Sequence, residues 1–200
     1  MFDAKLRPLI DPPLNAVGRS IAKLGLSADQ VTFIGFLIGL LSFGAIALGW
    51  FWLGLLFLAL NRLADGLDGA VARATVMTER GGFLDIAFDF LFYALVPLGF
   101  AIADPAQNAL PACILICSFV GTGSSFLAFA ITAEKQGLST QAQGKKSFYY
   151  LEGLTEGTET IACFVLMCAF PSWFPVLALI YAALCFITTG MRIHRGWTTL

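Results

Sequence analysis

Six long apolar runs, separated by short polar breaks, constrain what this chain can fold into more than any other feature of its sequence. A helix needs about 20 residues to cross the hydrocarbon core of a bilayer, and each run approaches or exceeds that length. The runs cover residues 31–50, 52–73, 82–103, 109–133, 147–169 and 173–193. Because the chain has 200 residues in all, no room is left for a separate soluble domain. We therefore predict an all-α integral membrane protein with six transmembrane helices, in which residues 1–200 form one membrane-embedded domain.

The composition excludes two other classes of protein. Hydrophobic residues make up 58% of the chain and charged residues only 12%, whereas soluble domains have about 45–50% apolar and about 25% charged residues. A water-soluble globular domain is therefore excluded. The formal net charge is −1 and no basic block occurs, so a nucleic-acid-binding protein, which needs a cationic surface, is excluded as well.

The twelve Lys and Arg residues lie on one predicted side of the membrane. They fall in residues 1–28, near the connections after the second and fourth runs, and after the last run, whereas the other three turns contain none. Because positive residues mark the cytoplasmic side, we expect both termini in the cytoplasm and the protein in the inner membrane. Residues 1–28 combine four cations with three prolines and no continuous apolar stretch, which predicts an amphipathic juxtamembrane helix on the inner surface.

Acidic residues inside the predicted spans are the least expected feature. Seven of the thirteen lie there: Asp65, Asp68, Asp85, Asp89, Glu152, Glu156 and Glu159. A charged carboxylate at the bilayer centre costs roughly 2.5–3.5 kcal/mol on insertion scales, so the four aspartates together cost on the order of 10–14 kcal/mol. That cost is as large as the whole stability of a typical protein. Cations or a water-filled cavity must therefore meet these groups.

The spacing of the aspartates predicts a metal site. Asp65 and Asp68 lie one turn apart at the end of the second run, and Asp85 and Asp89 lie one turn apart at the start of the third. Two antiparallel helices joined by a short connection bring all four together just below the cytoplasmic surface. Carboxylate oxygens without His or Cys suit a hard cation such as Mg²⁺ or Mn²⁺. Arg73 beside them could hold a phosphate, so we expect a diphosphate substrate.

The same residues resemble a known family signature. Asp65-x2-Asp68-Gly69-x2-Ala72-Arg73, followed by Gly81-x3-Asp85-x3-Asp89, is similar to the motif of the CDP-alcohol phosphotransferases, or class I CDP-alcohol phosphatidyltransferases. Seven residues separate Arg73 from Gly81 where the family usually has eight, and we place this difference in the connecting loop, where it is tolerated. The stretch Ser27-x-Asp29-Gln30-x-Thr32 resembles the family's usual opening of the first span.

The resemblance implies a reaction and a role for each residue. Asp65, Asp68 and Asp85 would hold two divalent ions, Mg²⁺ or Mn²⁺, on the diphosphate of a CDP-linked lipid such as CDP-diacylglycerol. Asp89 would complete the metal site and act as general base on a small alcohol acceptor, which attacks the donor phosphorus while CMP leaves. The residues implied to bind CDP are Asp68, Gly69, Ala72 and Arg73.

Partners and packing follow from the same resemblance. It implies a catalytic domain embedded in the lipid bilayer, with the active site facing the cytoplasm, and it implies a homodimer. Small residues in Gly35-x3-Gly39 and in the run 121–125 are available for close helix contacts. Gly66 is also small, and it allows a ligand or a neighbouring helix to approach the backbone closely.

The acceptor pocket is predicted from the last two runs. Lys145, Lys146 and Arg192 are candidates to bind a head-group phosphate, with ordinary membrane anchoring as the alternative. Glu152, Glu156 and Glu159 recur as one helical stripe, and we include Glu156 and Glu159 in the pocket. In family members that use inositol phosphate, a comparable stretch carries arginines at the positions of Gly157 and Thr160. We therefore expect a hydroxyl-rich or cationic head group rather than a phosphorylated sugar.

Two alternative functions remain open at this point. A Mg²⁺-dependent membrane prenyltransferase also uses aspartate pairs on a diphosphate, but it usually has more spans and lacks the Asp-Gly-x2-Ala-Arg pattern. A small cation-coupled carrier could use the acids as a relay, but here four of them lie at one interface rather than along a path. Release of CMP separates the predicted transferase from both alternatives.

Overall fold

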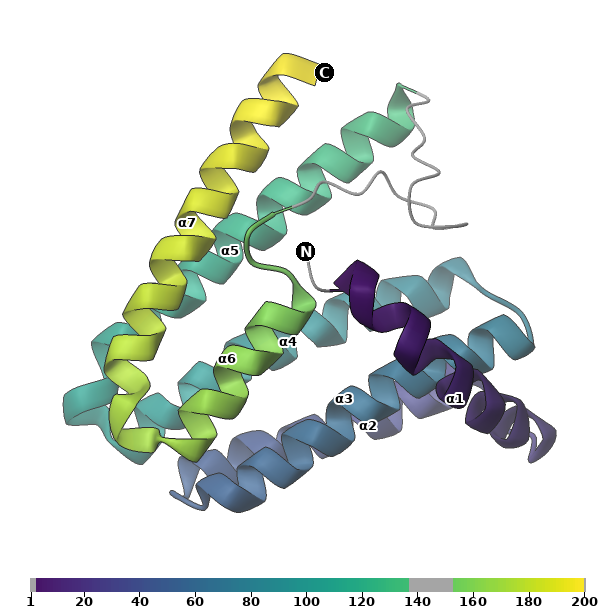
Figure 1. Cartoon of the computed structure of the whole chain (residues 1–200), viewed down its shortest axis with the longest axis horizontal. Coiled ribbons are helices and arrows are strands. Elements are labelled where there is room, and N and C mark those ends of the chain that lie inside the picture. The colour runs from purple at the N-terminus through teal and green to yellow at the C-terminus, as the bar shows by residue number, and fades with distance from the viewer. Residues whose placement is uncertain (1–2, 137–152, 200) are drawn as a thin grey trace.

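The computed structural model describes residues 3–136 and 153–199, and every regular element in these ranges is a helix (Figure 1). The helices are α1 (Asp3–Lys23), α2 (Ala28–Ala47), α3 (Phe51–Ala74), α4 (Glu79–Ala103), α5 (Pro105–Lys135), α6 (Gly157–Ala169), the short 3₁₀ helix η1 (Pro171–Trp173) and α7 (Phe174–Thr199). The prediction of an all-helical protein is confirmed for the described residues.

Four segments are long and apolar enough to cross a membrane, namely α2, α4, α5 and η1 with α7. Each coincides with a predicted span to within a turn or two. The helix α3 has 24 residues, or about 36 Å at the usual rise, and it matches the predicted run 52–73. Hydropathy alone does not mark α3 as a span because the part from Arg62 onward carries four charged side chains, those of Arg62, Asp65, Asp68 and Arg73.

The predicted span 147–169 is wrong at residues 153–156, which are not helical, while residues 147–152 lie outside the described residues. Its helix, α6, begins only at Gly157 and has 13 residues, or about 20 Å, which is too short to cross a hydrocarbon core of about 30 Å. The reason is a tertiary contact before the helix. The amide and hydroxyl of Thr155 both donate to the hydroxyl of Thr188 on α7, at 3.3 and 3.0 Å. These bonds replace the helical hydrogen bonds that Thr155 would otherwise make.

The first helix lies across α3, as Figure 1 shows. The two backbones approach closely at Gly18, where an added Cβ would lie 2.6 Å from the Cβ of Ala70. Gly66 of α3 faces the side chain of Leu14, so its small size allows the contact between α3 and α1. The helix ends before Gly25, whose φ of 85° is a left-handed conformation that favours glycine. The predicted N-terminal helix is therefore present from Asp3.

Aromatic stacking joins three turns at one end of the molecule. The ring of Phe100, near the end of α4, stacks on Phe51 at the start of α3 and on Phe174 at the start of α7, with centroid separations of 5.4 and 4.4 Å. These three turns are the ones without Lys or Arg. The connection between α3 and α4 lies at the opposite end of both helices, and the signature aspartates lie toward that end.

Small residues let the helices pack closely within the chain. An added Cβ on Gly35 would lie 3.0 Å from the Cβ of Ala64, and one on Gly121 would lie 3.0 Å from the hydroxyl of Thr189. The close contacts expected of Gly35-x3-Gly39 and of the run 121–125 are therefore contacts between helices of one chain. They give no support to the predicted homodimer.

Candidate active site

Three of the four signature aspartates form one group. The side chains of Asp65 and Asp68 come from the second half of α3, and that of Asp85 comes from the first half of α4. One carboxylate oxygen from each residue lies within 4.8 Å of those from the other two. The arrangement follows from the antiparallel pairing of α3 and α4 across the short connection 75–78. Three carboxylates at this spacing form a donor set that fits a hard divalent cation.

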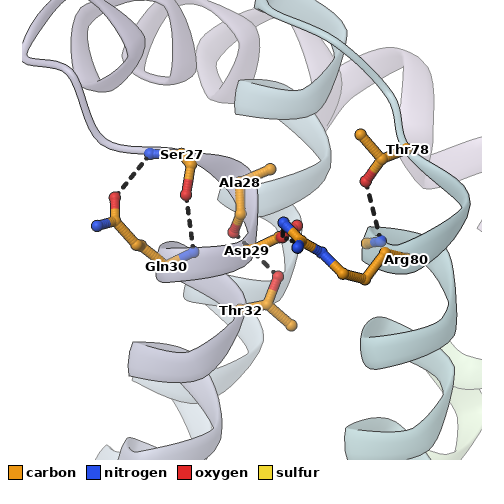
Figure 2. Close-up of polar contacts among 8 residues, drawn as sticks. Ser27, Ala28, Asp29, Gln30, Thr32, Thr78 and Arg80 are labelled. Carbon is orange, nitrogen blue, oxygen red and sulfur yellow. Dashed lines mark hydrogen bonds and ion pairs between the residues drawn. The ribbon is translucent and has the colours of Figure 1, made fainter.

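Asp68 is held in place from α2. Its side chain is buried, and the hydroxyl of Thr32 donates to its Oδ2 at 2.7 Å. The Thr32 hydroxyl also lies 3.0 Å from the carbonyl oxygen of Ala28 in its own helix, as Figure 2 shows. A hydrogen bond to a carboxylate is charge-assisted and therefore strong, so α2 supplies a fixed contact to the aspartate group.

Asp89 and Asp65 share one neighbouring cation. Oδ1 of Asp89 lies 2.8 Å from Nη1 of Arg62, and the same nitrogen lies 3.6 Å from Oδ2 of Asp65. The group of three carboxylates that come within 4.8 Å of one another does not include Asp89. The assignment of Asp89 to the metal ligands stays a prediction, and in the structure its carboxylate forms an ion pair with Arg62.

All four aspartates line one pocket. Its other lining residues are Thr32, Gly35, Phe36, Asn61, Arg62 and Phe88. The rings of Phe36 and Phe88 stack at a centroid separation of 4.2 Å, which closes one side of the pocket with apolar surface. Polar and charged groups from α2, α3 and α4 thus converge on a single space.

An ion pair connects the beginnings of α2 and α4 (Figure 2). Nη2 and Nε of Arg80 lie 2.6 and 3.0 Å from Oδ2 of Asp29. Asp29 lies one turn before Thr32, and Arg80 lies in the turn before Asp85. The pair therefore links the two helices that bring Asp68 and Asp85 together.

Both helices are also capped at these ends. The amide of Gln30 donates to the hydroxyl of Ser27 at 3.3 Å, and the amide of Gly81 donates to that of Thr78 at 3.0 Å. The signature glycine Gly81 has little space around it, since an added Cβ would lie 3.1 Å from both Asp29 Oδ1 and Thr78 Oγ1. A side chain at this position would displace the cap or the ion pair.

The residues expected to bind CDP lie along the end of α3. Nε of Arg73 donates to Oδ1 of Asn15 on α1 at 3.0 Å. The guanidinium of Arg73 lies over Gly69, where an added Cβ would come within 3.3 Å of it. Ala72 precedes Arg73 and is half-buried. The helix α1 therefore holds the arginine at the exposed end of the signature segment.

Of the three basic residues predicted to line the acceptor pocket, the structure describes only Arg192. Lys145 and Lys146 lie outside the described residues. Arg192 is buried in α7, where its Nη1 donates to the carbonyl oxygen of Thr122 at 3.1 Å and its guanidinium lies 5.6 Å from the ring centroid of Phe126. The alternative interpretation, in which Arg192 reaches out to the membrane surface, is wrong because only 8% of the residue is exposed.

The predicted stripe of three glutamates on one helix is also wrong. Glu152 lies outside the described residues, and Glu156 precedes α6 with an extended backbone. Its amide donates to Oε2 of Glu159 in the first turn of α6 at 3.2 Å, and its own Oε1 accepts the amide of Gly153 at 3.4 Å. The stripe requires a continuous helix through this segment, and the helix begins only after Glu156.

Sequence reasoning gave no role to four residues that shape the site: Thr32, Asn61, Arg62 and Arg80. For Arg62 a signal existed, since a cation inside an apolar run three residues before Asp65 requires a partner. Thr32 belongs to the stretch that resembles the family's opening of the first span, but the sequence assigned it no role. The contacts of Asn61 and Arg80 depend on tertiary packing and left no pattern in the sequence.

The fold and the site together define a helical membrane protein with a carboxylate site for a hard cation at one end of its helices. A protein-family model described as CDP-alcohol phosphatidyltransferase matches residues 26–192. Over 200 residues the chain is 53% identical to the inner membrane protein YnjF of Escherichia coli (strain K12), and the aligned region covers 100% of this chain and 97% of that protein. The chain belongs to the CDP-alcohol phosphatidyltransferase family, and it is a membrane transferase of phospholipid synthesis.

A more distant relative agrees with this assignment, and two solved structures have a similar fold. The archaetidylinositol phosphate synthase of Pyrococcus horikoshii is 37% identical over 118 residues, which are 58% of this chain and 63% of that protein. The phosphatidylinositol phosphate synthase PgsA1 of Mycobacterium tuberculosis, solved with CDP-DAG bound, has a TM-score of 0.74 at 22% identity and covers 92% of this chain and 94% of that one. A second structure of PgsA1, in complex with manganese and citrate, has a TM-score of 0.73 at 21% identity, covering 92% and 89%.

Proposed function

We propose that this protein transfers a substituted phosphate group from a CDP-linked lipid, such as CDP-diacylglycerol, to the hydroxyl of a small alcohol, with release of CMP. The observation that carries the proposal is the group of three carboxylates, Asp65, Asp68 and Asp85, with Asp89 in the same pocket. The family assignment supports it, as does the similarity to a synthase solved with CDP-DAG.

Each aspartate has a role in this proposal. Asp65, Asp68 and Asp85 hold divalent ions, Mg²⁺ or Mn²⁺, Asp89 completes the metal site, and two ions are proposed. The structure of PgsA1 in complex with manganese supports the use of a divalent ion. Ions held there would supply positive charge against the diphosphate and the leaving phosphate. Gly69, Ala72 and Arg73 bind the CDP portion together with Asp68, at the end of α3 where α1 fixes the arginine.

Asp89 acts as the general base. The oxygen of the acceptor hydroxyl forms a new bond to the donor phosphorus, and the bond from that phosphorus to the bridging oxygen of CMP breaks. The hydroxyl proton passes to the carboxylate of Asp89. Asp89 suits this role because it lines the pocket beside the three-carboxylate group and is held by Arg62. The products are a phosphodiester lipid and CMP.

The placement in the membrane is part of the proposal. Both termini and the carboxylate site face the cytoplasm, because the three turns without Lys or Arg meet at the other end. The apolar helices and the inner-membrane relative support a multi-pass protein of the inner membrane, with six apolar segments and residues 1–200 as one catalytic domain. Exposed Leu9 and Val17 on α1 support contact of this helix with the lipid surface. A homodimer is proposed from the family alone.

The acceptor is proposed to be a hydroxyl-rich head group without a phosphate. Glu156 and Glu159 place two carboxylates at the beginning of α6, so this end of α6 is acidic. The hydroxyl of Thr160 contacts the hydroxyl of Tyr181 at 2.8 Å. Arg192, Lys145 and Lys146 remain candidates for a phosphorylated acceptor, which the inositol phosphate synthases among the relatives favour.

The test uses the purified full-length protein in lipid nanodiscs with CDP-diacylglycerol and Mg²⁺. A panel of acceptors, including inositol and inositol phosphate side by side, is screened for CMP and for a new lipid. We expect CMP together with a lipid product from an unphosphorylated polyol. A product from inositol phosphate alone would reverse the acceptor proposal. No CMP with any acceptor would contradict the transferase reaction, and would leave the prenyltransferase and carrier alternatives to be tested.

A further inference from the structure

A hydrogen bond between α1 and the end of α3 joins two side chains that lie 58 positions apart in the sequence. Nε of Arg73 donates to Oδ1 of Asn15 at 3.0 Å. Asn15 is half-buried and Arg73 is exposed. An exposed hydrogen bond adds only modestly to the stability of a fold, because water can replace either partner. The main effect of this bond is therefore on the orientation of the arginine.

Close packing sets the position of α1 on α3. An added Cβ on Gly18 would lie 2.6 Å from the Cβ of Ala70, and one on Gly66 would lie 2.9 Å from Cδ1 of Leu14. Leu14 and Gly18 lie one turn apart on the face of α1 that packs against α3. Asn15 follows Leu14 at the edge of this face, so the packing fixes the backbone that carries its side-chain amide.

The guanidinium of Arg73 is directed toward the carboxylate group. Its Nη1 lies 3.3 Å from the position that a Cβ on Gly69 would take, so it covers the glycine one turn earlier in α3. Gly69 in turn lies one turn after Asp65 on the same face of the helix. Because Asn15 contacts Nε, the bond does not use Nη1 and Nη2, the two amino groups that can bind phosphate oxygens together.

We propose that Asn15 is a positioning residue for CDP binding, which holds Arg73 over Gly69 so that the terminal amino groups of the arginine meet a phosphate of CDP. The role of Arg73 rests on the proposed function, and that of Asn15 rests on the hydrogen bond and on the packing of α1. An arginine that is held in place before the ligand arrives loses less conformational entropy on binding. Loss of Asn15 therefore weakens the affinity for CDP and leaves the rate of the chemical step unchanged.

The experiment measures CDP binding to the purified full-length protein in lipid nanodiscs, by isothermal titration calorimetry with Mn²⁺ present. Asn15→Ala should raise the Kd for CDP at least about fivefold, because the arginine must then be ordered on binding. Alanine favours a helix more than asparagine does, so α1 remains helical. Ser20→Ala, an exposed change on the same helix, is the matched control and should bind CDP as the wild type does.

A double-mutant cycle separates positioning of the arginine from a general effect on packing. In the Arg73→Ala background, Asn15→Ala should change the Kd for CDP by less than about twofold, because the contact is already lost. An equal loss of affinity in both backgrounds would overturn the inference, and so would a wild-type Kd in Asn15→Ala. Because CDP binding is measured without an acceptor, a wild type that binds CDP but forms no CMP would contradict the proposed transfer alone.

Steady-state kinetics of Asn15→Ala cover the case in which Arg73→Ala binds CDP too weakly to titrate. We expect the KM for CDP-diacylglycerol to rise at least about fivefold, with kcat within about twofold of the wild type and the melting temperature unchanged. A purely structural role would lower the melting temperature and leave this KM unaltered. That result, or a fall in kcat as large as the rise in KM, would overturn the positioning role of Asn15.

Discussion

The hydroxyl of Thr32 donates a 2.7 Å hydrogen bond to Oδ2 of Asp68, and so joins α2 to the carboxylate group of α3 across 36 positions of the sequence. Both residues are buried. Removing such a donor leaves the buried carboxylate without a hydrogen bond, which destabilises the folded protein. The beginning of the first apolar helix is therefore part of the site, although none of the proposed metal ligands lies on it.

This contact predicts that Thr32→Val weakens metal binding. Valine has nearly the shape of threonine but no hydroxyl, and a hydrogen bond to a charged group contributes about 1.5–3 kcal/mol. We expect the Mn²⁺ concentration for half-maximal CMP formation to rise at least about fivefold, together with a lower melting temperature. Thr32→Ser keeps the donor and is the matched control. A wild-type Mn²⁺ requirement in Thr32→Val would show that the hydroxyl does not support Asp68.

The base assignment predicts the effect of Asp89→Asn on the reaction. The amide keeps the size of the carboxylate but does not accept the proton, and loss of a general base costs about 10²–10⁴-fold. We expect kcat to fall at least about a hundredfold, while affinity for the CDP-lipid at saturating Mn²⁺ stays within about threefold.

The matched control is Asp104→Asn at the opposite end of the molecule. There the side chain caps α5 by accepting the amide of Gln107, and asparagine caps as well as aspartate. Activity of this variant should equal that of the wild type. A loss of CDP-lipid affinity in Asp89→Asn as large as the loss of turnover would assign Asp89 to substrate binding and not to proton transfer.

Two neighbouring glycines offer a test of why the signature requires Gly81. An added Cβ at Gly81 meets Asp29 and Thr78 at 3.1 Å, whereas one at Gly82 meets nothing within 4 Å. Gly82→Ala should be neutral or stabilising, since alanine is favoured over glycine in a helix by about 1 kcal/mol. Gly81→Ala should lower both the melting temperature and CMP formation, the latter at least about tenfold. Equal behaviour of the two variants in a thermal melt and an activity assay would contradict the steric explanation.

The sequence predicts those helices whose position follows from the local pattern of apolar residues. Apolar length indicated α2, α4, α5 and α7, and helical spacing indicated that Asp65, Asp68 and Asp85 converge. The start of α6 could not be predicted in this way. Residues 153–156 before it are not helical, because Thr155 forms hydrogen bonds with Thr188, which lies 33 positions away in the sequence.

The site itself was predicted in part. The acidic residues could be identified as site residues because a carboxylate inside a membrane has a high free energy unless a cation or water compensates its charge. The partner of each acid could not be predicted, because the contacts of Asp68 with Thr32 and of Asp89 with Arg62 form only when α2, α3 and α4 pack together. Arg62 was counted among the cations near a cytoplasmic connection, and its pairing appears only in three dimensions.

The donor set predicts the metal requirement. Three carboxylates form a site for a hard cation, and the described residues place no His or Cys in the group. CMP formation should require Mg²⁺ or Mn²⁺ and should be abolished by EDTA. Mn²⁺ added in excess should restore it, whereas Zn²⁺ should not. Activity that persists after exhaustive chelation, checked by elemental analysis of the protein, would contradict metal-dependent transfer.

The last prediction concerns the acidic end of α6 and distinguishes an acceptor contact from a purely structural one. Glu159→Gln retains a side-chain oxygen that can accept the amide of Glu156, so the cap survives while the charge is lost. If the carboxylate contacts the acceptor equally in the ground and transition states, its loss raises the KM for the acceptor and leaves kcat unchanged. We expect that KM to rise at least about fivefold with the KM for the CDP-lipid unaltered. Glu134→Gln, an exposed change near the end of α5, is the control. A lower melting temperature with both KM values unchanged would mean that Glu159 only caps the helix, and the argument for an unphosphorylated acceptor would lose its main support.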